Sequence, residues 1–177
     1  MVWMDLEMTG LDPINDRIIE MATLITDSQL NIIAEGPCLI VHQSDKVMDN
    51  MNDWCIKHHG DSGLTAAVKA STISQEEACR QTRDFILDHC LPGRAPLCGN
   101  SIGQDRMFLL HHMPDILDVL HYRVVDVSSF KELFNRWYGQ KNCTFPKATN
   151  HRALDDILES IGELKFYREK FLIPSEK

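Results

Sequence analysis

Three apolar-rich runs joined by short polar links open the chain, and each has the length and composition of a β-strand. They cover residues 2–6, 17–26 and 30–41, and Gly36-Pro37 interrupts the third run. Strands that follow one another across such short links usually pair with their neighbours in opposite directions. The first part of the chain therefore predicts an antiparallel meander of three strands.

From residue 45 onward the apolar residues recur mainly at helical spacing. Ser74 and Glu77 form a capping box, in which each side chain satisfies a backbone N–H group at the start of a helix. Ser129 and Glu132 form a second box and predict the start of a helix that reaches residue 137. The middle of the chain is thus expected to be largely helical.

The remaining elements follow from shorter patterns. Strands are expected at 96–99 and 122–127, a helix at 101–112, and an irregular polar loop at 139–150. Residues 151–171 predict a long closing helix. Its apolar stripe consists of Leu154, Ile157, Leu158, Ile161 and Leu164.

A meander followed by alternating helices and strands is the element order of an α/β domain. We expect an RNase H-like fold, with a mixed five-stranded sheet flanked by helices, as a single domain over residues 1–177. Hydrophobic residues make up 44% of the chain and charged residues 25%, which is ordinary globular composition. This composition excludes an intrinsically disordered chain.

Charge and apolar content narrow the function classes further. A net charge of −8 argues against a protein that coats long nucleic acid, but it allows a small anionic substrate. No apolar run approaches the ~20 residues of a membrane span, and no leader for secretion is recognisable. The six cysteines are scattered without a C-x-x-C pair, as in proteins of a reducing compartment. We therefore expect a cytoplasmic protein without a membrane partner.

Asp5 and Glu7 are the first candidates for chemistry. Side chains two positions apart on a strand point to the same face, so these two carboxylates project together while Val2, Met4 and Leu6 face the core. Such a pair can hold a hard divalent cation, or it can lie on a solvated strand end. These residues alone favour neither interpretation.

Acids farther along the chain add to this pair. Asp105 lies on the apolar face of its helix, which indicates either a buried partner or simply an acid in a helix's first turn. His151 precedes the last helix, and Asp155 and Asp156 both lie off its apolar stripe. Periodicity does not distinguish which of these two aspartates enters a site.

Two acids on the first strand, a third on a central helix and His-x-x-x-x-Asp at the last helix form the ordered signature of DEDDh exonucleases. Four stretches resemble the oligoribonuclease family of this group, in its bacterial form. They are 5–11 (DLEMTGL), 99–106 (GNSIGQDR), 121–128 (HYRVVDVS) and 151–156 (HRALDD). The resemblance runs from about residue 2 to residue 172, essentially the whole chain.

The resemblance implies 3′→5′ hydrolysis of short oligoribonucleotides, especially dinucleotides, to nucleoside 5′-monophosphates. In that chemistry two divalent ions, Mg²⁺ or Mn²⁺, lie ~4 Å apart and clamp the scissile phosphate. The family's pattern assigns His151 as the general base, a role that suits a side chain whose pKa is near neutrality. It assigns the metal ligands as Asp5, Glu7, Asp105 and Asp156.

The resemblance also implies a set of substrate-binding residues. Leu11 corresponds to a wedge against the bases, and Trp54 and His59 to residues that line the site. Arg123 and Ser128 correspond to a pocket for the terminal 5′-phosphate, and Ser101 belongs to the same substrate-binding set. Tyr122 corresponds to a residue donated by a second subunit, which implies a homodimer.

Two alternatives stay open at this stage. A proofreading-type DNA exonuclease has the same five catalytic residues but acts on longer single strands and does not need Arg123. A non-catalytic RNA-binding relative could keep the fold, although such proteins tend to lose metal ligands and all five candidate positions are filled here.

Overall fold

The computed structural model describes residues 1–146 and 152–172, and its centre is one five-stranded sheet. The strand order across the sheet is β3-β2-β1-β4-β5, so β1 is the central strand. The strands are β1 (Val2–Met8), β2 (Ile18–Thr26), β3 (Ile32–Ile40), β4 (Pro96–Gly99) and β5 (His121–Asp126).

The sheet is mixed, as the sequence predicts. The strand β1 pairs antiparallel with β2, and β2 pairs antiparallel with β3, which confirms the meander. On its other side β1 runs parallel to β4, and β4 runs parallel to β5. In the β1–β2 pair Glu7 lies opposite Glu20, and because directly opposed residues share a face, both acids lie on the same side of the sheet.

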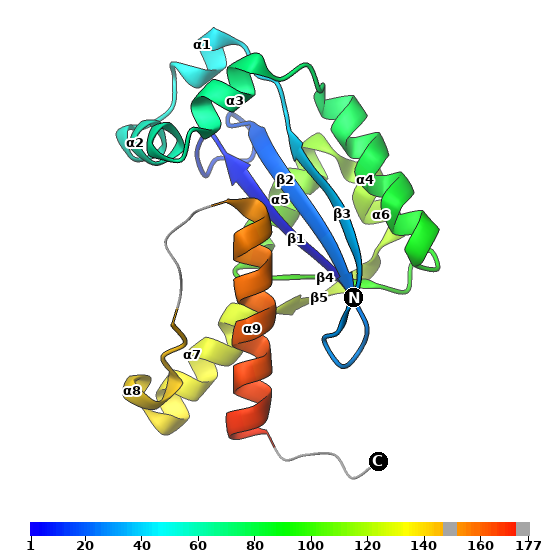
Figure 1. Cartoon of the computed structure of the whole chain (residues 1–177), viewed down its shortest axis with the longest axis vertical. Helices are drawn as coiled ribbons and strands as arrows, with labels where there is room; N and C mark the ends of the chain where they lie inside the picture. The colour runs from blue at the N-terminus through cyan, green and yellow to red at the C-terminus, as the bar shows by residue number, and fades with distance from the viewer. Residues whose placement is uncertain (147–151, 173–177) are drawn as a thin grey trace.

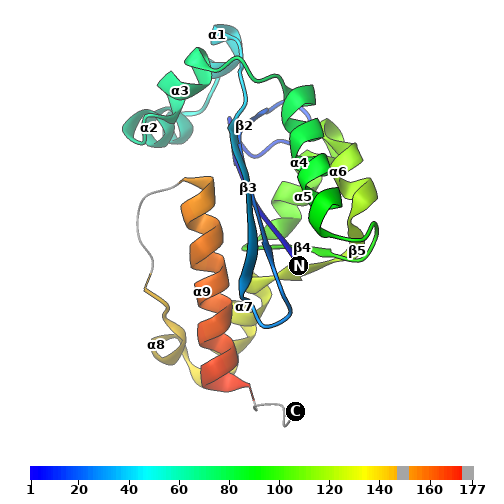
Figure 2. The same ribbon diagram turned by 45° about the vertical axis from the view of Figure 1, so that its right-hand side comes forward.

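Helices cover both faces of the sheet (Figures 1 and 2). The helices α4, α5 and α6 lie on one face, and α9 lies on the other together with α7, while α1 to α3 gather near the carboxyl end of β1. Their bounds are α1 (Asp45–Met48), α2 (Asp53–Asp61), α3 (Leu64–Ala70), α4 (Gln75–His89), α5 (Ile102–His112), α6 (Pro114–Val119), α7 (Val127–Tyr138), α8 (Gln140–Cys143) and α9 (Ala153–Phe171). No helix of the described residues has the length and apolar character to cross a membrane.

Alternating residues of β1 contribute to two separate cores. Val2, Met4 and Leu6 pack into the core beneath α4, α5 and α6, as expected from the sequence. Trp3 faces the other way and is fully buried against residues of α7 and α9, including Ile157. Asp5 and Glu7 share the face of Trp3, so they lie on the side of the sheet that α9 covers.

The stripe predicted for the last helix is largely confirmed. Ile157 and Ile161 are buried in the core on this side, and Leu154 and Leu164 pack against it. Leu158 is 41% exposed and does not join them. The reason is geometric, because Ile157 already points at the sheet and the next residue on a helix is turned about 100° away.

The two predicted capping boxes have different outcomes. The Ser74 side chain accepts a hydrogen bond from the backbone N–H of Glu77 at 3.2 Å, so this helix start is confirmed. The Glu77 carboxylate instead accepts hydrogen bonds from Arg80 and Gln81. Only the serine half of the first box is therefore formed.

The second box is wrong. The helix α7 begins at Val127 directly after β5, and the Asp126 side chain caps it by accepting from the backbone N–H of Ser128 at 2.9 Å. Because strand and helix follow each other without a loop, Ser129 already lies inside the helix. The short helices α6 and α8 were not predicted, and α8 occupies the start of the expected 139–150 loop.

Candidate active site

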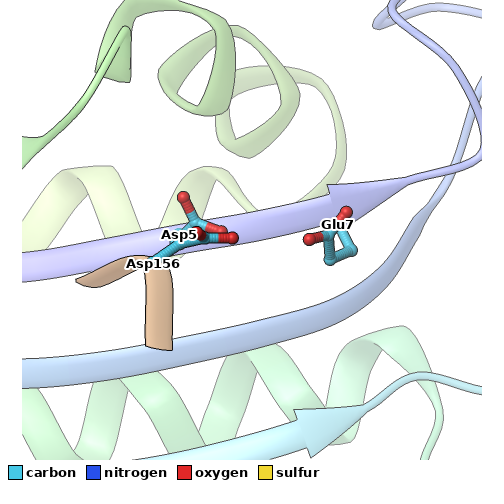
Figure 3. Close-up of side chains that lie close together, drawn as sticks. All are labelled: Asp5, Glu7 and Asp156. Atoms are coloured by element: carbon cyan, nitrogen blue, oxygen red, sulfur yellow. The ribbon is translucent and has the colours of Figure 1, made fainter. Parts of the chain in front are cut away.

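Three carboxylates meet above the central strand (Figure 3). Asp5 and Glu7 come from β1, and Asp156 comes from the first turn of α9. One oxygen from each lies within 4.8 Å of the others. Asp155, the other acid that the sequence left open at this place, is exposed to solvent. The geometry therefore brings Asp156, and not Asp155, to the acids of β1.

This cluster holds its protons tightly when no cation is present. Burial raises the pKa of Asp5 well above its usual range, and the charges of Asp105 and Asp156 add to the effect. Burial, followed by the charges of Asp156 and Glu20, raises the pKa of Glu7 to about 8. Burial and the neighbouring acids disfavour the charged forms of these carboxylates, and a bound cation would favour them. Carboxylate oxygens are also the donors that hard divalent cations prefer. The three residues therefore fit a divalent metal ion.

Asp105 lies beside this group. It is 6% exposed in the first turn of α5, and its carboxylate accepts a hydrogen bond from the backbone N–H of Leu6 at 3.0 Å. Burial raises the pKa of Asp105 to about 7, although this hydrogen bond lowers it. Among the described residues, Asp105 is near enough to raise the pKa of Asp5, but it is outside the three-carboxylate cluster.

A cavity of about 510 Å³ opens next to Glu7. It contains three of the residues expected to bind substrate: Leu11, Trp54 and His59. The side chains of Leu11 and Trp54 are exposed, at 74% and 59%, so both present apolar surface at the cavity. The lining residues are Leu6, Glu7, Met8, Gly10, Leu11, Asn52, Trp54, Cys55 and His59.

His59 forms the buried wall of this cavity. Its Nε2 lies 2.9 Å from the carbonyl oxygen of Met8, and its Nδ1 lies 4.0 Å from a carboxylate oxygen of Glu7. Burial lowers the pKa of His59 below its usual value, which favours the neutral ring. His59 therefore links α2 to the end of β1 and leaves Glu7 without a permanent cationic partner at this side.

The turn that carries Leu11 is held from two directions. Gln104 on α5 donates a hydrogen bond to the carbonyl oxygen of Leu11 at 2.7 Å. Thr9 donates to the Asp16 carboxylate at 3.0 Å, and a side chain at Gly10 would collide with this carboxylate. The backbone of the turn is thus fixed, while the Leu11 side chain stays exposed.

Ser101 and Ser128 lie together at the starts of α5 and α7. Their hydroxyl oxygens are 3.1 Å apart, and the backbone N–H of Ser101 donates to both Ser128 and the Asp126 carboxylate. Ser101 has a φ of 52°, a left-handed conformation that is rare outside glycine and is typical of constrained functional positions. Asn100 accepts a hydrogen bond from Ser128 and joins this pair to α9 by donating to Ser160.

Tyr122 and Arg123 lie on β5, at the edge of the sheet. Tyr122 is 71% exposed, and the Arg123 guanidinium lies 5.2 Å from the centre of its ring. Neither residue lines the cavity beside Glu7. His151 lies outside the described residues.

The sequence analysis missed Glu20, Arg152 and Gln104. Glu20 is completely buried on β2 and forms an ion pair with Arg152 at 2.6 Å, immediately before α9. An acid inside the apolar run of residues 18–25 is a signal that could have identified Glu20, because buried acids need partners. Neither Arg152 nor Gln104 carries a comparable signal in the sequence.

The family match makes this chain an exonuclease by class. Residues 2–164 match the exonuclease family named RNase T. Exonuclease I of Methylocaldum szegediense matches 96% of this chain with a TM-score of 0.72 at 17% identity. An Exonuclease I of E. coli, solved in complex with a dT13 oligonucleotide, matches 96% with a TM-score of 0.72 at 14% identity. The chain spans about two fifths of the length of these solved chains, 40% and 41%, and at these identities it shares their RNase H-like fold.

Relatives of higher identity identify the subgroup. The oligoribonuclease of Marinobacter nauticus is 55% identical over 97% of this chain and 95% of its own length. The mitochondrial oligoribonuclease of Homo sapiens is 57% identical over 95% of this chain and 71% of its own length. This chain belongs to the oligoribonucleases. It is therefore a nuclease, and bacterial and mitochondrial relatives resemble it to a similar degree.

Proposed function

We propose that this protein removes nucleoside 5′-monophosphates from the 3′ end of short oligoribonucleotides, with dinucleotides as preferred substrates. One observation carries the proposal: the carboxylates of Asp5, Glu7 and Asp156 lie beside a cavity with Leu11 and Trp54 at its walls. Acidic residues that fit cations are thus adjacent to apolar surfaces that fit bases. The names of the relatives support the choice of RNA as the substrate.

In this proposal Asp5, Glu7, Asp105 and Asp156 hold two divalent ions, Mg²⁺ or Mn²⁺. Such ions supply Lewis-acid chemistry to phosphodiester hydrolysis, because they offset the negative charge that develops on the phosphate. The contact of the Asp105 carboxylate with the backbone N–H of Leu6, between Asp5 and Glu7 on β1, and its influence on the pKa of Asp5 support its inclusion in this set. The raised pKa values of Asp5 and Glu7 support cation binding there, since a cation favours their charged forms.

His151 is proposed as the general base that takes a proton from the attacking water. The support comes from the sequence: a histidine five positions before Asp156 matches the family signature, and histidine titrates near neutral pH.

Substrate length is proposed to be limited by the site itself. A cavity of about 510 Å³ lies within the range of small-ligand pockets, roughly 300–1,000 Å³. The Leu11 side chain wedges against a base, Trp54 offers a ring for stacking, and His59 closes the inner wall. A site of this size favours a few nucleotides over a long strand, and it suits a protein with net charge −8.

The 5′-phosphate of a dinucleotide is proposed to bind Arg123, Ser128 and Ser101. The two serine hydroxyls lie at the starts of α5 and α7, where the helix dipoles favour an anion. Asp126 already accepts from the backbone N–H groups of both serines, and the Ser128 hydroxyl donates to Asn100. The proposed donors to phosphate are therefore the Arg123 guanidinium and the Ser101 hydroxyl, once the latter turns away from Ser128. Charge-assisted contacts from arginine to phosphate are strong and directional.

A homodimer is proposed to complete the site, with Tyr122 reaching into the cavity of the partner. The exposed Tyr122 ring and the position of β5 at the sheet edge support this arrangement. The cytoplasm is proposed as its compartment, in keeping with the six cysteines, all of which are free thiols.

Hydrolysis of a 5′-phosphorylated diribonucleotide with Mg²⁺ or Mn²⁺ tests the proposal directly. We expect mononucleotide as the product, and we expect Asp5→Ala and Asp156→Ala to abolish turnover because each removes a carboxylate of the cluster. Persistence of the dinucleotide with the wild-type protein would refute the proposed function. Substantial turnover by Asp156→Ala would refute the assignment of that residue.

A DNA exonuclease for longer single strands is the second candidate, and the shared fold with the E. coli Exonuclease I solved with dT13 is the observation in its favour. The Arg123→Ala variant separates the two. We expect a selective loss on dinucleotides if Arg123 binds the terminal phosphate. Unchanged activity of Arg123→Ala on longer single-stranded DNA, with wild-type turnover of that DNA exceeding dinucleotide turnover, would favour the DNA exonuclease instead. Equal losses on both substrates would count against the phosphate contact of Arg123.

A further inference from the structure

Glu20 is a fourth acid on the face of the sheet that α9 covers. It lies on β2 directly opposite Glu7, and none of its surface is exposed. A carboxylate in such a place needs a positive partner with well-aligned hydrogen bonds, because desolvation of an ion is costly. Glu20 does not line the cavity beside Glu7. Its partner is instead a side chain at the start of α9.

That partner is Arg152. Its Nε donates to both carboxylate oxygens of Glu20, at 3.0 and 3.1 Å, and one terminal nitrogen lies 2.6 Å from Oε1. The backbone N–H of Ala153, the first residue of α9, makes a longer hydrogen bond of 3.5 Å to the same carboxylate. Glu20 therefore binds the start of α9 through one side chain and one backbone group.

The start of α9 determines where Asp156 lies. Arg152 is the N-cap residue, and its carbonyl oxygen accepts a hydrogen bond from the backbone N–H of Asp156 at 3.0 Å. Asp156 is thus one helical turn beyond the point that Glu20 holds. Glu20 lies opposite Glu7 in the β1–β2 pair, so its contacts with Arg152 and Ala153 place the first turn of α9 next to the strand that carries Asp5 and Glu7.

We infer that Glu20 and Arg152 are positioning residues, which hold the first turn of α9 against β2 so that Asp156 meets Asp5 and Glu7. The inference rests on the proposed function, since it takes Asp156 as a metal ligand. Residues that orient metal ligands from behind typically contribute 10–100-fold to metal affinity or activity. The site thus includes Glu20 and Arg152, which determine the position of the Asp156 carboxylate.

Arg152→Lys tests the geometry while keeping the charge, because a lysine cannot make the two-pronged contact of an arginine. We expect about tenfold weaker Mn²⁺ binding, measured by electron paramagnetic resonance, and about tenfold lower kcat. The KM for a diribonucleotide should stay within about twofold, since Leu11 and Trp54 lie on other elements. A loss of global stability alone would leave the Mn²⁺ affinity of the folded protein unchanged.

Arg80→Lys is the matched control. Arg80 lies on α4, where it pairs with Glu77 at 2.7 Å and with Asp84 at 3.3 Å on the protein surface. We expect this variant to bind Mn²⁺ and to turn over substrate as the wild type does. If Arg152→Lys behaves like Arg80→Lys in both measurements, the inference is overturned.

The double variant Glu20→Leu/Arg152→Leu removes both charges, so neither charge is left buried without its partner. Apolar replacement of a buried ion pair often preserves folding, so we expect a cooperative melting transition together with weak Mn²⁺ binding. A folded double variant with wild-type Mn²⁺ affinity and kcat would overturn the inference. Should wild type itself bind no Mn²⁺, the metal site of the proposed function fails and the inference fails with it, whereas loss of only the positioning effect leaves the proposed function intact.

Discussion

At each carboxylate of the site, protons and metal cations compete for the same oxygen atoms. Glu7 has no permanent cationic partner in the cavity, and its pKa of about 8 follows from burial and from the charges of Asp156 and Glu20. Asp105, with a pKa of about 7, and Asp5 are shifted in the same direction for the same principal reason. These residues therefore couple the stability of the metal-free protein to pH.

The metal-free protein should become less stable as the pH rises from 5 to 8. The folded-state pKa of Glu7 lies above its ordinary value of 4.5, so the folded protein binds more protons than the unfolded chain in this range. The free energy of unfolding therefore falls with rising pH. Melting curves in EDTA at pH 5 and pH 8 measure this effect, and Mg²⁺ should restore stability at pH 8. A Tm in EDTA that rises across this range would contradict the assignment.

Leu11→Ala should weaken substrate binding without destabilising the fold. Leu11 is 74% exposed, so its truncation leaves no cavity in a core, but a buried contact with a base would be lost. We expect the KM for dinucleotides to rise about tenfold, equivalent to about 1.4 kcal/mol, with Tm unchanged. Leu91→Ala is the control, because Leu91 has the same exposure and does not line the cavity. Equal kinetics for the two variants would refute the wedge.

Elements differ in how far their sequence determines their role. The alternation in β1 predicts both the core residues and the shared face of Asp5 and Glu7, because a strand has one simple period. Helical periodicity locates α9 but does not choose between Asp155 and Asp156, since both lie away from its apolar stripe. That choice depends on how α9 is docked on β2, which is a contact between segments far apart in the sequence.

The cap of α7 shows a different limit. The serine-glutamate pattern at 129–132 has the right spacing, yet Asp126 takes the capping position because β5 continues directly into the helix. Local pattern is insufficient here, since the end of the strand is fixed by its pairing with β4. The same aspartate also holds Ser101, so the position of the serine pair follows from sheet geometry.

Asp126→Ala should destabilise the protein and disturb the serine pair. Loss of an N-cap costs ~1 kcal/mol, which corresponds to a fall in Tm of about 2–4 °C for a chain of this size. Ser129→Ala, at the position that the sequence pattern favours, should leave Tm unchanged. Differential scanning calorimetry of the two variants compares them directly. A larger loss for Ser129→Ala would show that Asp126 is not the effective cap.

At the scale of the whole molecule, the sheet has two edges with different surroundings. The β3 edge exposes Ile32 and Ile33 and leads toward α1, whereas β5 exposes Tyr122 and Val124 and lies near α7 (Figure 1). Element order and hydrophobic patterns suffice to predict the mixed sheet. They do not reveal which edge pairs with another molecule, because that depends on surfaces assembled from several elements.

Activity per molecule should fall on dilution if a homodimer completes the site. Sedimentation velocity measures the dimer fraction, and dinucleotide hydrolysis is followed over the same concentrations. Tyr122→Ala should lower the activity of the dimer. When Tyr122→Ala subunits are mixed with excess Asp5→Ala subunits, part of the activity should return. In such a mixed dimer the intact carboxylates of one subunit are combined with the intact Tyr122 of the other. Activity per molecule that is constant while the protein dissociates would exclude the shared site.

The position of α9 also affects when the protein becomes active during its synthesis. A ribosome adds residues at about 5–20 per second, so β1 emerges on the order of ten seconds before the helix that carries Asp156. Until then Asp5 and Glu7 face a side of the sheet on which no helix has docked, and Arg152 has not yet reached Glu20. Under the proposed function, a nascent chain surrounded by ribosomal and messenger RNA still lacks Asp156, so the order of translation is expected to delay nuclease activity.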